Sequence, residues 1–205
     1  MITIALPKGR LSEETISILQ KSYPDLEIPK EENRELSYTS KDGRFRFLSV
    51  RSNDVGTYIQ FGVADLGIIG WDTYLENGYE LFCIQDLNIG KCRLSIAAKP
   101  GFSLEGYSRK LRVATKFPKL TREYFGAKGI SIEIIKLYGS VELAPILGLS
   151  DCIVDLVSTG GTLKANGLVE VETILESTAR LVTSESSFYT RNPEIQTLLK
   201  DFAVG

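Results

Sequence analysis

The chain contains 205 residues, of which 43% are hydrophobic, so it is long enough to bury the core of one large domain or of two small ones. Its formal net charge of −2 gives no overall field that would attract nucleic acid or an anionic membrane, so local basic residues must bind any anionic ligand. The absence of histidine excludes a Ser-His-Asp triad, a Cys-His pair and a histidine-ligated metal.

The first part of the chain predicts short strands and helices. Residues 2–6 are apolar and predict a strand, and residues 11–22 carry apolar side chains at helical spacing. Residues 36–39 and 45–50 predict a hairpin around a Lys-Asp-Gly turn. Further on we predict a helix from the capping cluster at 52–54 to about Gly62, a strand at 65–70, a helix at 71–77, and strands near 80–85 and 93–98.

The second part alternates between strand and helix patterns. We predict strands at 111–115, 131–137 and 152–157 and helices at 120–128 and 141–148. Such alternation implies a parallel sheet with right-handed crossovers. The segment 169–182 is rich in β-branched residues and is predicted to carry the chain back, before a final helix from residue 192 or 193 to about residue 202.

The whole pattern predicts an α/β fold of two lobes. We assign residues 1–92 and 176–205 to the first lobe and residues 93–175 to the second. Ligands of such sheets bind at the carboxyl ends of strands. The loops that follow residues 6, 50, 69, 115 and 157 all come after predicted strands. We therefore expect one composite site in a cleft between the lobes.

The most informative loop begins at Asp155, near the end of an apolar run, and leads into a short predicted helix at 163–167. A helix N-terminus offers free N–H groups and a favourable dipole to an anion, and glycine lets the backbone approach it closely. Asp155 could accept hydrogen bonds from sugar hydroxyls, so we predict a phosphosugar site; a solvated turn is the alternative. The loop residues assigned to the phosphate are Ser158, Thr159, Gly160, Gly161 and Thr162.

Basic residues follow other predicted strands. Lys8 and Arg10 flank a glycine after the first strand, which suits a polyphosphate, although solvated basic residues at a helix start are the alternative. Helix capping accounts for the residues after Arg51 but not for Arg51 itself. Lys116 is equally compatible with a cation that faces the cleft and with an ordinary turn lysine, and the polar surroundings of Arg34 favour a solvated side chain.

A further polar turn follows the predicted strand at 131–137. Ser140 is predicted to cap the next helix, and Glu142 to lie in its first turn, where the helix dipole alone would explain a carboxylate. The three cysteines, at positions 83, 92 and 152, form no CxxC pair and suit a reducing compartment. With no long apolar run and no signal-peptide pattern, we expect a cytoplasmic protein that spans no membrane.

Motifs in order along nearly the whole chain resemble one enzyme family. They lie at 5–11 (ALPKGRL), 53–55 (NDV), 64–68 (ADLGI), 92–94 (CRL), 113–118 (VATKFP), 139–145 (GSVELAP), 148–151 (GLSD), 153–155 (IVD) and 158–163 (STGGTL). This set resembles ATP phosphoribosyltransferase, the first enzyme of histidine biosynthesis. The loop also resembles that of type I phosphoribosyltransferases, but they carry two adjacent acidic residues where this chain has Asp155 and Leu156.

The resemblance implies transfer of 5-phosphoribose from phosphoribosyl pyrophosphate (PRPP) to N1 of ATP, which yields N1-(5-phosphoribosyl)-ATP and pyrophosphate. It implies a fold like the type II periplasmic binding proteins. Because the chain ends at Gly205, soon after its last predicted helix, we expect the short form, without a C-terminal regulatory domain. That form implies a homodimer of the catalytic chain and a regulatory subunit related to histidyl-tRNA synthetase, together in a hetero-octamer.

The resemblance also suggests roles for the candidate residues. The loop residues would bind the 5-phosphate, and Asp155, with Glu142 as a second candidate, would bind the ribose. Lys8 and Arg51 would contact pyrophosphate, while Arg10 and Arg34 would contact the ATP phosphates. We expect Mg²⁺ to arrive with PRPP, without a metal site built from protein side chains. The alternatives are a type I transferase acting on a free base and a non-catalytic small-ligand binding protein.

Overall fold

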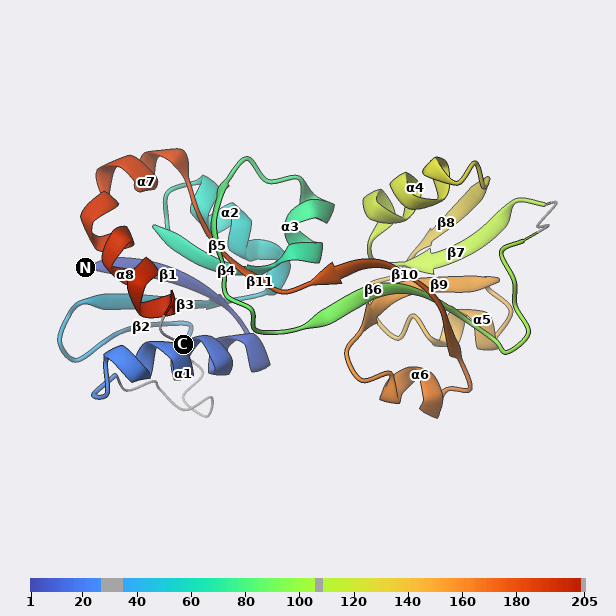
Figure 1. Ribbon diagram of the computed structural model, residues 1–205, viewed down its shortest axis with the longest axis horizontal. Helices are drawn as coiled ribbons and strands as arrows, with labels where there is room; N and C mark the ends of the chain where they lie inside the picture. The colour runs from blue at the N-terminus through green and yellow to red at the C-terminus, as the bar shows by residue number, and fades with distance from the viewer. Residues whose placement is uncertain (27–34, 106–108, 204–205) are drawn as a thin grey trace. The chain divides into compact units, whose positions relative to one another are not determined.

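A computed structural model describes residues 1–26, 35–105 and 109–203 and divides the chain into two compact units (Figure 1). Unit 1 comprises Met1–Gly90 and Thr178–Gly205, and unit 2 comprises Lys91–Ser177. The boundaries expected from the sequence, at 92/93 and 175/176, each lie two residues inside unit 2. The candidate residue Arg34 lies outside the described residues.

Unit 1 is built on a six-stranded sheet in the order β2-β3-β1-β4-β11-β5. β1 runs parallel to β3 and β4, whereas β2, β11 and β5 pair with their neighbours in antiparallel fashion. The parallel trio brings the carboxyl ends of three strands to one edge. The strands are β1 (Ile2–Pro7), β2 (Ser37–Thr39), β3 (Phe45–Val50), β4 (Leu66–Gly70), β5 (Phe82–Asp86) and β11 (Ala179–Thr183).

Helices cover both faces of this sheet. On one face α1 (Arg10–Ser22) and α8 (Asn192–Ala203) contribute Ile16, Leu19 and Ile195 to a buried core. On the other face, α2 (Val55–Gln60) and α3 (Trp71–Asn77) pack over a second core. The short helices η2 (Ser52–Asp54) and α7 (Glu185–Thr190) complete the unit.

Unit 2 is built on a five-stranded sheet in the order β10-β6-β9-β7-β8. Its strands are β6 (Cys92–Ala98), β7 (Leu111–Thr115), β8 (Ile132–Lys136), β9 (Cys152–Val157) and β10 (Val169–Ser177). β7 is parallel to β8 and β9, but β6 is antiparallel to both β9 and β10. The predicted parallel pairing is confirmed for the three strands that alternate with helices. β6 and β10 lie outside that alternation and pair in antiparallel fashion.

The two faces of the unit 2 sheet are covered by different helices. On the face called here the α4 face, α4 (Pro118–Ala127) packs through Phe125 against side chains such as Leu94 and Ile96. On the opposite face, called the α6 face, α5 (Leu143–Ile146) and α6 (Gly161–Ala165) pack against Ala97 and Ile153. Where a strand is regular, successive side chains alternate between these two faces.

The turn before α5 differs from the prediction. α5 spans four residues and not the predicted 141–148, and its N-cap residue is Glu142 and not Ser140. Ser140 has a positive φ of 48°, which is not the extended conformation of a capping residue. Bonds from Leu143 N to Ser140 O and from Ala144 N to Val141 O form tight 3₁₀-type turns instead, so the chain reaches helical geometry later than expected.

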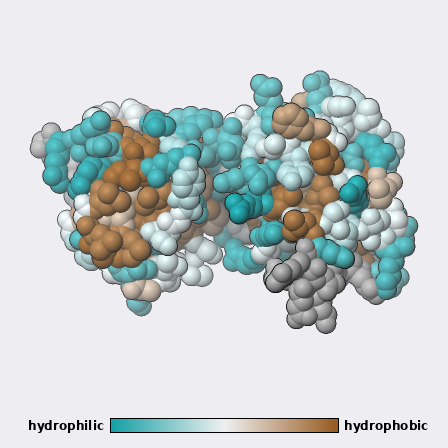
Figure 2. Space-filling view, turned by 180° about the vertical axis from the view of Figure 1, so that it is seen from behind, coloured by the Kyte–Doolittle hydropathy of each residue, from teal (hydrophilic) through white to brown (hydrophobic). Residues whose placement is uncertain are grey.

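The surfaces of both units mix polar with apolar residues (Figure 2). The exposed apolar side chains include a group on α5 and the turn after it, formed by Leu143, Ile146, Leu147 and Leu149. Within the described ranges, every helix is too short or too polar to cross a lipid bilayer.

Candidate active site

The predicted phosphate loop lies between β9 and α6 in unit 2. Gly160 is the N-cap of α6 and adopts a left-handed conformation, with φ of 77°. The first intrahelical bond runs from Lys164 N to Gly160 O, so helix geometry leaves the N–H groups of Thr162 and Leu163 without partners inside the helix. Thr159 Oγ1 accepts a long bond of 3.4 Å from Gly161 N. The loop therefore presents backbone and hydroxyl donors that a phosphate could accept from.

The loop lines a small cavity together with two carboxylates. The cavity has a volume of about 180 Å³, and its wall consists of Glu142 and the continuous segment from Asp155 to Leu163. The structure thus brings together all the residues that the sequence predicts for the 5-phosphate and the ribose of PRPP. A cavity of this size suits a phosphate and part of a sugar, but not a whole nucleotide.

Asp155 lies at the centre of this polar edge. Its Oδ1 accepts a hydrogen bond of 2.8 Å from Leu156 N. The same oxygen forms an ion pair with Lys116 Nζ at 3.3 Å. β7 and β9 run parallel, so Lys116 follows β7 at the edge where the phosphate loop begins. The side chain of Lys116 is 41% exposed, so its ammonium group is accessible from solvent while it pairs with Asp155. Of the two alternatives for Lys116, the structure supports the cation beside the site.

A second charged group borders the loop. Arg93 on β6 pairs with Glu170 on β10, through bonds of 2.6 Å from Nε to Oε1 and 2.5 Å from Nη2 to Oε2. The buried Ser95 hydroxyl also donates to Glu170 Oε1, at 2.7 Å. The hydrogen bond from Arg93, and then that from Ser95, lower the pKa of Glu170 to about 2. Sequence reasoning assigned neither Arg93 nor Glu170 to the site, because 77 residues separate them.

Unit 1 carries the predicted basic residues at the carboxyl ends of β1 and β3. Pro7 pairs with Val50 in the register of these parallel strands, and Lys8 N donates to Val50 O at 3.0 Å. Lys8 and Arg51 are therefore the next residues on neighbouring strands. Both are exposed, and within the described part of the chain no carboxylate forms an ion pair with either of them. Two unpaired cations at one sheet edge attract a polyphosphate.

Arg10 lies in the first turn of α1, where its Nε is 3.2 Å from Glu14 Oε1. The Arg10 side chain is 59% exposed, and an exposed pair of this kind is worth little, so an anion could compete for the guanidinium. Gly9 precedes the helix with φ of 89°, a conformation that favours glycine, and its carbonyl accepts from Ser12 N.

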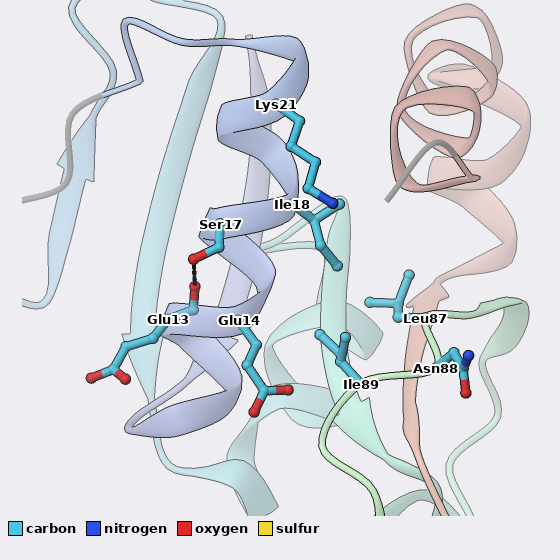
Figure 3. A pocket seen from close by; sticks show the side chains of 8 residues that line it. All are labelled: Glu13, Glu14, Ser17, Ile18, Lys21, Leu87, Asn88 and Ile89. Carbon is cyan, nitrogen blue, oxygen red and sulfur yellow. Dashed lines mark hydrogen bonds between the residues drawn. The ribbon is translucent and has the colours of Figure 1, made fainter.

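A second cavity lies elsewhere in unit 1 and does not suit a polyphosphate (Figure 3). It has a volume of about 510 Å³ and is lined by Glu13, Glu14, Ser17, Ile18, Lys21, Leu87, Asn88 and Ile89. Two glutamates and one lysine give this wall a negative balance. Glu14 is also engaged by Gly90 N at 2.8 Å. We therefore assign neither substrate to this cavity.

Comparison with known proteins supports one family. The model of the family described as "HisG: ATP phosphoribosyltransferase" matches residues 51–203. An ATP phosphoribosyltransferase from Leptospira biflexa is 59% identical over 200 residues, which cover 98% of this chain and 98% of the relative. The match therefore includes both units and both sets of candidate residues.

Solved structures agree with the sequence relatives. A chain of the ATP phosphoribosyl transferase (HisG:HisZ) complex from Thermotoga maritima aligns with a TM-score of 0.84 and 35% identity, over 99% of this chain and 97% of that one. The alkanesulfonate-binding protein SsuA from Xanthomonas axonopodis pv. citri aligns with a TM-score of 0.59 and 14% identity, over 98% of this chain and 71% of that one. The second likeness confirms the two-lobe fold of binding proteins. The chain belongs to the ATP phosphoribosyltransferase family, as one of its short-form members.

Proposed function

We propose that this pentosyltransferase of the first step of histidine biosynthesis divides its work between two sets of residues. The unit 2 loop binds the 5-phosphate of PRPP, and the basic sheet edge of unit 1 binds pyrophosphate. The observation that carries this proposal is the cavity in which the loop's donors and two carboxylates line one wall. It combines donors for a phosphate with acceptors for hydroxyls, which is the chemistry of a phosphosugar.

Each loop group has a role in PRPP binding. The N–H groups of the first turn of α6, with the hydroxyls of Ser158, Thr159 and Thr162, donate to the 5-phosphate. Asp155 exchanges its ion pair with Lys116 for bonds from the ribose hydroxyls, and Glu142 is a second acceptor at the same wall. Lys116 then remains beside the ribose as a free cation. The loop thus fixes one end of the substrate and aims the anomeric carbon.

The chemistry needs charge stabilisation more than proton transfer. N1 of adenine has a lone pair and no hydrogen, so its attack on the anomeric carbon requires no base, which agrees with a chain that lacks histidine. Positive charge develops on the ribose while the C–O bond to pyrophosphate breaks. Lys8 and Arg51 stabilise the negative charge that grows on the leaving group. Arg10 binds an ATP phosphate after release from Glu14, and Arg34 keeps the same role as a proposal from the sequence.

Magnesium reaches this site on the substrate. Among the described residues there is no group of three or more histidine, cysteine, aspartate or glutamate side chains that could hold an ion. The pyrophosphate oxygens of PRPP are hard ligands of the kind that Mg²⁺ prefers. We propose that the ion is carried by them, and that it adds to the positive charge that Lys8 and Arg51 place around the leaving group. Because ATP and PRPP are intracellular metabolites, we place the reaction in the cytoplasm.

We also propose that the chain works with a second kind of subunit. The Thermotoga maritima relative was solved as a HisG:HisZ complex. By analogy this chain binds a regulatory subunit related to histidyl-tRNA synthetase, and a homodimer of the catalytic chain is the unit that enters the hetero-octamer. The exposed apolar group around Leu147, which is itself 77% exposed, is suited to contacts of this kind.

An assay with one catalytic variant tests the proposal. The chain, with and without its regulatory partner, is incubated with PRPP, ATP and Mg²⁺, and the phosphoribosyl-ATP formed is measured by mass spectrometry. Asp155→Ala should lose roughly a hundredfold or more in turnover, because the ribose loses its acceptor. Glu133→Ala, an exposed carboxylate on the edge strand β8, is the control and should keep the native rate. Equal rates for Asp155→Ala and the native chain would refute the ribose assignment.

A further inference from the structure

Strand β10 contains two irregularities that decide which way its carboxylates point. Glu170 pairs with Ala97 and Glu172 with Ile96, so two residues of β10 advance while β6 advances by one. The register shifts again between Thr173 and Leu175. Such β-bulges re-aim side chains and are frequent next to active sites.

The first bulge separates two glutamates that regular alternation would place together. Ala97 belongs to the core of the α6 face and Ile96 to the core of the α4 face, so their partners Glu170 and Glu172 lie on opposite faces. Glu172 accordingly pairs with Lys128 at the end of α4, at 2.5 Å. Glu170 instead lies on the face that carries the phosphate loop.

On that face Glu170 holds Arg93 beside the start of the loop. The β6–β9 ladder ends where Arg93 pairs with Val157, so the carbonyl of Ser158 lies beyond its last rung. Arg93 Nη1 donates to that carbonyl at 3.2 Å. The guanidinium therefore supplies a hydrogen bond to a carbonyl that lies beyond the end of the strand ladder. Its other two nitrogens donate to the two carboxylate oxygens of Glu170. Thr173 Oγ1, at 3.3 Å from Glu170 Oε1, adds a further bond.

The loop has few other bonds that fix its position. Arg93 bonds to a backbone carbonyl of the loop. Among the described residues, the one hydrogen bond made by a side chain of residues 158–161 is the long bond from Gly161 N to Thr159 Oγ1. A loop anchored at Gly160 by α6 alone would be free to turn about residues 158 and 159. Its donors would then have to be ordered when the substrate binds, at a cost in affinity.

We propose that Arg93, oriented by Glu170, is a positioning residue that fixes the Ser158 end of the loop for PRPP. This inference rests on the proposed function of the loop. Arg93 acts through the Ser158 carbonyl and needs no contact with the substrate. Its fork geometry matters, because one guanidinium must bind a carboxylate at two points and a carbonyl at a third.

The test compares two glutamates of the same strand. PRPP and ATP affinities are measured by calorimetry on Glu170→Gln, Arg93→Gln and the control Glu172→Gln, which removes an ion pair of similar exposure on the α4 face. Loss of a hydrogen bond to a charged group should weaken PRPP binding by roughly tenfold or more in the first two variants. ATP affinity should stay within about twofold, and Glu172→Gln should bind PRPP like the native chain.

A loop variant separates this inference from the function on which it rests. If Thr162→Ala weakens PRPP binding and Glu170→Gln does not, the positioning role of Arg93 is wrong and the assignment of the loop to the 5-phosphate stands. If Thr162→Ala binds PRPP normally, the loop assignment itself is wrong. Equal losses in Glu170→Gln and Glu172→Gln would show a general effect on β10 and would also overturn the inference. Should Arg93→Gln fail to fold, Glu170→Gln, which keeps the side-chain shape, decides the question.

Discussion

Replacing Arg51 with alanine should lower kcat by roughly a hundredfold or more, because the leaving pyrophosphate loses a preorganised cation. Arg51 follows β3 at the sheet edge where Lys8 follows β1, and it forms no ion pair within the described part of the chain. The Arg51 side chain is exposed, so its removal should leave the fold intact. The rate should therefore fall while the thermal unfolding temperature stays close to native. Steady-state kinetics with PRPP and ATP, together with a melting curve, measure both.

The matched control for this variant is Arg46→Ala. Arg46 is an exposed arginine of the same strand, and its Nε donates to Ser37 Oγ at 3.1 Å. It pairs with Thr3, well before the carboxyl end of β1, so it should not affect turnover. If Arg51→Ala kept the native kcat and the native PRPP affinity, the assignment of pyrophosphate to this edge would be wrong. An equal loss in Arg46→Ala would point to a general effect of surface charge instead.

Replacing Gly160 with valine should weaken PRPP binding by roughly tenfold or more, which corresponds to the loss of about one good hydrogen bond. Gly160 has φ of 77°, and a β-branched residue in that conformation costs about 1–2 kcal/mol. A new Cβ would meet only Val157 Cγ1, at 3.9 Å, so crowding adds little. The chain should fold, but with the loop shifted and its donors no longer converging on one phosphate.

Gly167→Val separates strain from function. Gly167 follows α6 with φ of 68°, and a Cβ there would meet no atom within 4 Å. Its backbone strain is therefore similar, although it does not line the cavity. Both variants should lose comparable stability, and only Gly160→Val should lose PRPP affinity, as measured by calorimetry. PRPP affinity that is native in Gly160→Val would refute the phosphate-loop assignment.

The sequence predicts those elements whose signals are local. The helix at 71–77 has the predicted bounds because Gly78 ends it with φ of 61°. The strands at 111–115 and 152–157 also have the predicted bounds, since each is an apolar run ended by polar residues. The sequence does not predict the helix α7, because its six residues show no periodic pattern, although Ser184 caps it by accepting from Ser187 N.

The residues of the candidate site also differ in whether local sequence signals predict them. The phosphate loop is continuous in sequence, so its strand, glycines and helix start can be recognised together. The sequence does not reveal that two charged residues, Lys116 and Arg93, lie beside the loop. They reach it through strand pairing between distant segments. The role of Glu170 depends on a bulge in β10, and a regular strand would have placed it on the same face as Glu172. Family membership excludes the two alternative functions that the residues had left open.

We propose that the 5-phosphate of PRPP binds the unit 2 loop while pyrophosphate binds the unit 1 edge. A crystal structure of the chain with PRPP tests it most directly. We expect the 5-phosphate within hydrogen-bond distance of Thr162 N and the loop hydroxyls, the ribose hydroxyls on Asp155, and the pyrophosphate towards Lys8 and Arg51. A reversed substrate, with pyrophosphate in the cavity of the 158–162 loop and the 5-phosphate beside Arg51, would contradict the account.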